Sequence, residues 1–381
     1  MADRLTLTSP YLDVLEVQRA ALVGALAPVL TADDIEAAHR ESARLSVRLD
    51  ASPLEDETAA AVDRGEAPDQ PIPGGVRDGA GWASVLRLEG MPTQDIAALE
   101  YRGVRAAQAD EAGLAAAFFD APVATLARVQ RHVVAGLIDD ERLGALRSTT
   151  RAVHDGAQGR VIFHAPPPER LPGLLAELDA WVRTARTGHD PLVIAGVVHG
   201  RLLHWRPFEA GNGRVARLAS RIALRASGGD PWGVAVPERV LVRDPLRYAS
   251  EIAATIRRRT DLRPWNERAA EAVVAALEQD ARRLRLAPEG VDARAMRACG
   301  AVTPGDTVTV PQMAAEAGLD RAAALVQCNR LCWAGLLRRD MGTHGLRYVR
   351  TATDVSDRAG RSSPNAWHYP PAVACSDRGR G

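Results

Sequence analysis

The stretch HGRLLHWRPFEAGNGRVARL, residues 199–218, decides how the chain folds and what it could bind. Gly211 and Gly213 can take backbone conformations that other residues avoid, so successive N–H groups there can converge on one anion. The helix expected from about Arg214 adds its positive N-terminal end. Arg214 and Arg217 lie on one side of that helix and can hold phosphate. The stretch predicts a cradle for a di- or triphosphate, although four letters alone equally fit a glycine turn with solvent-facing arginines.

The sequence around this stretch has a mainly helical pattern. Two helices are expected in residues 11–50 and a buried helix in 191–204, and the helical body ends near Arg283. Glycine, proline and aspartate gather in residues 63–82, which indicates a linker or long loop. The fold class predicted is mostly α.

A short β-prone run interrupts the helices. Val161, Ile162 and Phe163 follow a glycine turn, and three prolines end the run, which predicts a small hairpin. A helix with one apolar stripe then opens near Glu169.

Three separated segments carry a family resemblance. The run H-x₇-P-F-x-x-G-N-G-R-x-x-R, ending at Arg217, resembles the signature of the Fic (Fido) family. The hairpin with PPPERLPGLLAEL resembles the flap and following helix of that family, and the segment around Tyr248 also resembles it. The resemblance covers about residues 92–270 and implies a helical bundle. It also implies transfer of AMP from ATP to a Ser, Thr or Tyr hydroxyl of a target protein.

The resemblance also implies roles for individual positions. In the family, a His before Pro-Phe takes the hydroxyl proton, and an acidic residue just before GNGR holds Mg²⁺ against the phosphates. The flap adds a strand to the target's backbone, which here would involve Val161, Ile162 and Phe163. The nucleotide-binding residues would be Gly211, Asn212, Gly213, Arg214 and Arg217.

This chain departs from the family at two of those positions. Arg206 occupies the position of the base, and arginine offers no proton acceptor. Ala210 occupies the acidic position and has no oxygen ligand for magnesium. Loss of a positioned base typically costs about a hundred- to ten-thousandfold in rate. Arg206 could instead point into the cradle and strengthen anion binding, or turn to solvent.

Neighbouring residues are candidates to replace the missing groups. His204, two residues before Arg206, would lie on nearly the opposite side of a continuing helix, which favours a helix-surface or core-edge role over a base. Glu209 could reach the metal site by a one-residue shift in the loop. His199, more than a turn upstream, is expected to be a hydrogen-bonded core residue.

A segment near the N-terminus resembles a regulatory helix of the family, whose pattern is Ser/Thr-x-x-x-Glu-Gly/Asn. In the family the Glu pairs with the second motif arginine and blocks productive ATP binding. Here ARLSVRLDAS supplies Ser46, Asp50 and Ala51. Asp is one methylene shorter than Glu, so a bidentate contact with Arg217 would be strained or longer. The alternative is an ordinary amphipathic helix that ends at Asp50.

Residues 297–350 predict a separate module. A short strand, two helices and two strands around a glycine turn describe a winged helix. DNA binding needs several phosphate contacts and base-edge readers, and the basic residues of this module are few. The sequence therefore favours protein interaction over DNA binding. The resemblance leaves regulation, a homodimer or target choice open for this module.

The composition limits which kinds of mechanism and which cellular location the chain can have. The 381 residues have zero formal net charge, and all 48 basic residues are Arg, which excludes lysine-based mechanisms. Four cysteines without C-x-x-C spacing, no signal-like start and no apolar run of bilayer length predict a soluble cytoplasmic protein.

The sequence thus predicts four regions: 1–90, N-terminal helices with the regulatory segment and linker; 91–285, the Fic core; 295–350, the winged helix; and 351–381, a disordered tail. The leading function is binding of ATP or another phosphate ligand in the GNGR loop, with impaired or altered AMP transfer. The alternatives are an active AMP transferase using His204, with Glu209 assisting Mg²⁺, and a DNA-binding regulator with a ligand-sensing core.

Overall fold

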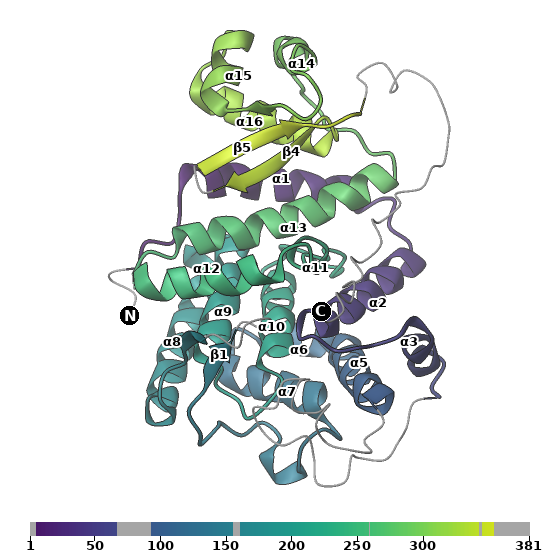
Figure 1. Cartoon of the computed structure of the whole chain (residues 1–381), viewed down its shortest axis with the longest axis vertical. Coiled ribbons are helices and arrows are strands. Elements are labelled where there is room, and N and C mark those ends of the chain that lie inside the picture. The colour runs from purple at the N-terminus through teal and green to yellow at the C-terminus, as the bar shows by residue number, and fades with distance from the viewer. Residues whose placement is uncertain (1–4, 67–92, 155–160, 259, 343–344, 354–381) are drawn as a thin grey trace, which may run out of the picture.

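The structure is a computed structural model that describes residues 5–66, 93–154, 161–258, 260–342 and 345–353. Residues 67–82 of the predicted linker and residues 354–381 of the predicted tail lie outside the described residues. The described chain is predominantly α-helical (Figure 1), which confirms the predicted fold class.

Two consecutive helices form the centre of the larger hydrophobic core. Helix α9, Pro191–Trp205, is buried on almost every side, as its continuous apolar sequence predicts. Helix α10, Asn212–Ala226, packs along α9 and begins directly after the GNGR turn. Helices α7, Pro122–Val134, and α13, Arg263–Arg283, cover this pair (Figure 1). The residues that connect α9 to α10 are therefore held between buried helices.

Shorter elements complete this larger unit. The remaining helices around the central pair are α5 (Thr93–Ala109), α6 (Glu111–Ala117), α8 (Leu171–Gly188), α11 (Glu238–Leu241) and α12 (Pro245–Arg258). Two 3₁₀ turns, η2 and η3, span Asp140–Arg142 and Pro168–Arg170. The predicted hairpin strands are present as the antiparallel pair β1, Ala152–His154, and β2, Val161–His164.

The N-terminal helices share the core of this unit. Helix α1, Pro10–Leu26, packs along α13, and α2, Ala32–Leu49, packs on α5, α10 and α11. Thr31 caps α2, because its hydroxyl accepts from the Asp34 N–H while the Asp34 carboxylate accepts from the Thr31 N–H. Helix α3, Asp56–Asp63, follows α2 and lies against α5.

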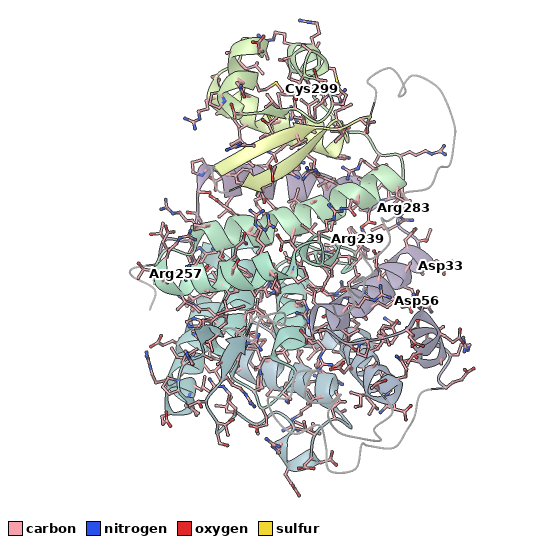
Figure 2. All side chains as sticks on the ribbon, viewed as in Figure 1. Asp33, Asp56, Arg239, Arg257, Arg283 and Cys299 are labelled. Atoms are coloured by element: carbon pink, nitrogen blue, oxygen red, sulfur yellow. The ribbon has the colours of Figure 1, made fainter. Side chains whose placement is uncertain are left out.

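The C-terminal residues form a second, smaller core. A three-stranded antiparallel sheet has the order β3-β5-β4. Cys299, Cys328 and Cys332 are buried here (Figure 2 marks Cys299) as free thiols. The prediction of a winged helix stays a prediction. The elements of this module are α14 (Ala293–Gly300), β3 (Thr307–Val308), α15 (Val310–Ala317), α16 (Arg321–Trp333), β4 (Leu337–Gly342) and β5 (Gly345–Arg350).

Helix α16 of this module faces the rest of the chain and packs against α1 and α13. Arg339 of β4 donates to both carboxylate oxygens of Glu278 on α13, at 2.7 and 2.9 Å, and its Nε donates to Asn329 on α16. Both members of the Arg339–Glu278 pair are almost fully buried. Truncating one partner of such a pair leaves an uncompensated buried charge, so both residues are needed where the module meets the larger unit.

Among the described residues, no helix is both long and apolar enough to cross a membrane.

Candidate functional site

The GNGR turn joins two helices through left-handed backbone conformations. Helix α9 ends at Arg206, whose φ is +45°, and Gly211, with φ +72°, is the N-cap residue of α10. A Cβ on Gly211 would lie 2.6 Å from Cγ1 of Val134, so both the backbone angle and the packing require glycine. The first N–H groups of α10 follow this residue directly, and they have no acceptor within the helix.

Asn212 holds the turn together rather than facing outward. Its side-chain oxygen accepts from the backbone N–H of Phe208 at 2.9 Å, and its Nδ2 donates to the Phe208 carbonyl at 2.8 Å. This reciprocal pair fixes the five residues from Phe208 to Asn212. The side chain of Asn212 is therefore engaged within the loop, and the nucleotide-binding role predicted for this residue stays a prediction.

Arg147, which the sequence did not single out, supports the turn from behind. It is 2% exposed and donates to four backbone carbonyls. Two of these belong to Trp205 and Arg206, at the end of α9, and the others to Thr149 and Pro166. The backbone N–H of Arg147 also donates to the Pro207 carbonyl. One guanidinium thus ties the end of α9 to the segment that follows the flap.

Arg217 meets both predicted residues of the regulatory segment. Its Nε donates to the Ser46 hydroxyl at 2.7 Å, and its Nη2 donates to the Ser46 carbonyl at 2.7 Å and to Asp50 Oδ1 at 2.8 Å. Burial disfavours the charge of Arg217, but Asp50 and Tyr248 outweigh this effect and raise its pKa above the ordinary value. The expected contact between Asp50 and Arg217 is present, through one carboxylate oxygen; its inhibitory role stays a prediction.

The second oxygen of Asp50 faces the other motif arginine. Asp50 Oδ2 lies 3.4 Å from Arg214 Nε, and Arg214 Nη1 lies 2.7 Å from Glu100 Oε1 of α5. A Cβ on Gly213 would collide with Asp50 Oδ1. A carboxylate therefore occupies the N-terminal end of α10 between the two arginines. Glu100 had no signal in the sequence, because it is one acidic residue in an ordinary helix.

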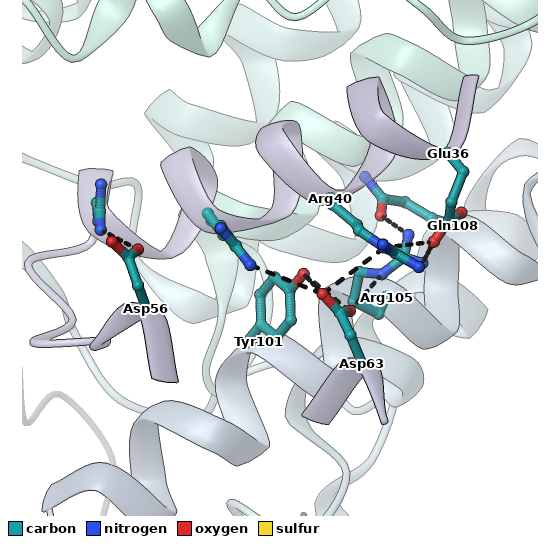
Figure 3. A network of polar contacts seen from close by, with 9 residues as sticks. Glu36, Arg40, Asp56, Asp63, Tyr101, Arg105 and Gln108 are labelled. Atoms are coloured by element: carbon teal, nitrogen blue, oxygen red, sulfur yellow. Dashed lines mark hydrogen bonds and ion pairs between the residues drawn. The ribbon is translucent and has the colours of Figure 1, made fainter. Parts of the chain in front are cut away.

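Helix α2, which carries Asp50 at its C-terminal end, is held to its neighbours by ion pairs (Figure 3). Arg105 Nη2 of α5 donates to Glu36 at 2.5 Å, and Arg40 and Arg44 of α2 lie 3.7 and 3.8 Å from a carboxylate oxygen of Asp63 on α3. On its other side, Glu41 receives two hydrogen bonds from Arg239 of α11. Figure 2 shows Arg239 in this region. The carboxylate is thus presented by an anchored helix.

Arg206 lies beside the same group of charges. The atom Nε is buried and has no hydrogen-bond partner in the part of the chain that the structure describes. Burial lowers the pKa of Arg206, an effect that Asp50 and Tyr248 oppose and Arg217 reinforces. Arg206 therefore adds a third guanidinium group, in addition to Arg214 and Arg217, at the turn between α9 and α10.

His204 lies apart from this cradle. Its ring packs edge-on against Phe163 of the flap, with ring centres 6.2 Å apart. It lines a cavity of about 160 Å³ with Arg201, Thr255 and Trp265 among others. Burial lowers its pKa to about 4, with Arg201 adding to the effect. These contacts agree with the core-edge position expected from its offset on α9.

His199 is buried and lies 2.7 Å from the Tyr248 hydroxyl through Nε2. Burial lowers its pKa to about 3, and the charge of Arg217 acts in the same direction. It is therefore a neutral core histidine, and the hydrogen-bonded core position predicted for it is confirmed.

The residues at the expected magnesium position do not fit that ion. Ala210 brings no oxygen from its side chain, and the buried Glu209 carboxylate forms an ion pair with Arg142. The Glu209 carbonyl accepts from Arg151 at 3.1 Å. Within the described residues, no group of three or more His, Cys, Asp or Glu side chains could hold a metal. The predicted metal role of Glu209 stays untested, and its carboxylate is already compensated by a cation.

The flap residues form the outer strand of a two-stranded pair. Phe163 pairs with Val153, and Ala152 pairs with His164, so β1 covers one edge of β2. Val161 is exposed, while Ile162 and Phe163 are half-buried. The role in target docking predicted for Val161, Ile162 and Phe163 stays a prediction.

Comparison with known proteins bears on the same residues. Residues 120–224, which include α7 to α9, most of α10, both flap strands and the GNGR turn, match the family model described as Fic/DOC family. The chain is 30% identical over 128 residues to the Protein adenylyltransferase Fic of Culex quinquefasciatus, a match that covers 33% of this chain. It spans only 24% of the length of that relative.

Solved structures share the fold at lower identity. A Fic family protein from Desulfovibrio desulfuricans superposes with a TM-score of 0.59 at 20% identity, covering 92% of this chain and 99% of the other. Fic-1 from C. elegans gives a TM-score of 0.50 at 18% identity, with 72% of each chain covered. The fold therefore extends beyond the matched domain to most of this chain.

Proposed function

Because this chain carries a domain of the Fic/DOC family at residues 120–224, we propose that its GNGR turn binds the phosphates of ATP or a related nucleotide. The observation that carries the proposal is the convergence of Arg214 and Arg217 on one carboxylate, that of Asp50, at the N-terminal end of α10. The chain's own anion occupies the position where backbone N–H groups and two guanidinium groups favour negative charge. A phosphate group would use the same donors.

AMP transfer by this chain is impaired or altered in this proposal. The named relative is an adenylyltransferase, but the position that would need a proton acceptor holds Arg206. His204 does not replace it, because its ring packs against Phe163 and lines a separate cavity with Arg201 and Trp265. A nucleotide would then be held with slow turnover, since binding groups are present and the acid–base group is missing.

Asp50 regulates the cradle in this proposal. A nucleotide phosphate and the Asp50 carboxylate compete for Arg214 and Arg217, so the apo protein favours the carboxylate. Productive binding requires Asp50 to leave. The anchored α2 helix makes this departure costly, and the nucleotide affinity of the natural chain is accordingly reduced.

The partner of the site is a target protein rather than DNA in this proposal. On α16, the side chain of Gln327 forms hydrogen bonds with the backbone of Asp292 and Gly290. The side chain of Asn329 forms hydrogen bonds with Tyr348 and Arg339. Side chains engaged within the chain are not available to base edges. The exposed flap strand is the surface that would present a target's hydroxyl to the cradle.

Transfer from α-labelled ATP tests the function. The natural chain should give little or no labelled protein, both on itself and on proteins of a cell extract. Arg206→His should increase labelling, and Arg206→His combined with Asp50→Asn should increase it further. Arg321→His, on the exposed start of α16, is the matched control and should leave labelling at the natural level. Robust transfer by the natural chain would overturn the impairment and favour an active transferase.

A further inference from the structure

The charges around the cradle differ from those of a site that uses a divalent cation. Arg206, Arg214 and Arg217 bring three guanidinium groups to the turn and the start of α10, whereas the carboxylates in ion pairs with Arg214 and Arg217 are Asp50 and Glu100. Glu100 remains with Arg214. If Asp50 withdraws, the described groups leave an excess of positive charge, which suits a multiply charged phosphate without a metal.

Among the described residues at this site, the oxygen ligands that magnesium needs are either paired with an arginine or missing. Magnesium requires near-octahedral oxygen coordination and is usually held by one or two carboxylates together with phosphates. Ala210 has no such group, and the Glu209 carboxylate is paired with Arg142. The Glu209 carbonyl is held by Arg151. A cation placed beside Arg206 would also be repelled by its guanidinium.

Arg206 is held in place by the fold. Its backbone adopts a left-handed conformation, which is costly for a residue with a Cβ. Its carbonyl accepts from Arg147 at 2.7 Å, and its N–H donates to the Leu202 carbonyl at 2.9 Å. Its buried Nε meanwhile lacks an acceptor among the described residues. A buried donor without an acceptor is itself costly, so an anion that supplies the acceptor is favoured.

We propose that the site binds its nucleotide phosphates without a divalent cation, and that the Arg206 guanidinium supplies the compensating charge. The inference rests on the proposed function, because it assumes that the cradle binds a nucleotide. It deepens that function by naming the ligand as a metal-free di- or triphosphate group. Arg206 then has a binding role that follows from the same property that excludes it as a base.

Calorimetric titration of the full chain with ATP and with ADP tests this inference. Each titration is run with EDTA and again with excess magnesium chloride, and each chain is prepared with and without Asp50→Asn so that the internal carboxylate does not mask binding. We expect binding in EDTA to be at least as tight as binding in magnesium chloride, because excess magnesium converts ATP and ADP into their magnesium complexes and leaves less of the metal-free nucleotide. Arg206→Gln should weaken metal-free binding by about tenfold or more. Arg321→Gln, a matched arginine in the C-terminal module, should change nothing.

A variant that restores an acidic group gives the converse result. Arg206→His combined with Ala210→Asp should bind ATP more tightly with magnesium than with EDTA, because an oxygen ligand replaces the fixed charge. Binding by the natural chain only in magnesium would overturn the inference while leaving the proposed function standing. Unchanged metal-free affinity in Arg206→Gln would remove the role of Arg206. Failure of every chain to bind under either condition would overturn the proposed function as well.

Discussion

Oδ1 of Asp50 lies 2.8 Å from Nη2 of Arg217, and Oδ2 of the same carboxylate faces Arg214 at 3.4 Å. The two residues are separated by 167 positions in the sequence. A single carboxylate thus bridges the two arginines of the GNGR segment from a helix that lies outside the matched domain.

Replacing Asp50 by Asn should strengthen nucleotide binding by about ten- to a hundredfold, because the competing charged hydrogen bonds are lost. The free protein should be less stable, since Arg217 is left buried without its counter-charge. Calorimetry and thermal unfolding measure the two effects. Asp56→Asn removes an exposed carboxylate near the same helix and should change neither the nucleotide affinity nor the stability of the protein. Equal affinity in the Asp50→Asn and Asp56→Asn chains would contradict the regulatory role.

Ala51→Gly should stabilise the protein by about 1 kcal/mol. Ala51 follows α2 with a φ of +62°, a conformation in which glycine avoids the strain of a Cβ. Denaturant unfolding provides the measurement. Ala60→Gly, within α3, should instead destabilise by about 1 kcal/mol, because glycine there only loses helix propensity.

Gly213→Ala should weaken nucleotide binding and displace Asp50. The added Cβ would collide with Asp50 Oδ1 and lie 3.2 Å from Arg217 Nη1, so neither a carboxylate nor a phosphate could approach the helix as closely. Gly173→Ala, in α8, meets no atom within 4 Å and should be neutral or slightly stabilising. Calorimetry compares the nucleotide affinity of both variants and so distinguishes a local effect at the start of α10 from a general effect of alanine in a helix. Similar affinities in the two variants would contradict the predicted role of Gly213.

Arg147→Met should destabilise the chain by about 3 kcal/mol or more. Four carbonyls would lose their donor in a buried place, and each buried unsatisfied group costs about 1–3 kcal/mol. Urea unfolding measures the loss. Arg170→Met, at an exposed position shortly before α8, should stay within about 0.5 kcal/mol of the natural chain. A neutral Arg147→Met would mean that these carbonyls find other donors.

Stability should fall between about pH 5 and pH 8 through Glu271. Burial raises the pKa of its carboxyl to about 7, and the Tyr11 hydroxyl donates to it at 2.5 Å. The folded chain therefore holds a proton that the unfolded chain has released. The contribution is full below the ordinary pKa, near 4.5, and is lost as pH rises through 7. Urea unfolding across this range should show a slope that Glu271→Gln reduces and that Glu57→Gln, at an exposed position, does not.

Local patterns predicted the elements and part of the site. The glycine pair fixed the turn, and the spacing from Ser46 to Asp50 predicted two side chains one helical turn apart, which meet Arg217. Arg147, Glu100 and Arg142 could not be predicted, because each acts through a long-range contact and none belongs to a local pattern.

The packing of α16 against α1 and α13 could be predicted from the sequence only in part. Apolar residues lie on several sides of this helix, and such a helix is usually buried on more than one face. Periodicity alone does not identify the partner, which proved to be α1 and α13. A helix able to enter a DNA groove needs an exposed polar face, and Gln327 and Asn329 are turned inward here.

Ion pairs of α2 with α3 and α5 (Figure 3) hold the helix that ends at Asp50, the residue that contacts Arg214 and Arg217. Linkage is reciprocal: if nucleotide displaces Asp50 as proposed, any molecule that loosens these ion pairs raises the affinity for nucleotide, and bound nucleotide loosens the ion pairs by the same free energy. A protein partner could therefore open the site from the α3 side without touching the ligand. Proteolysis of the α2–α3 segment would report occupancy of a cradle that the protease never reaches.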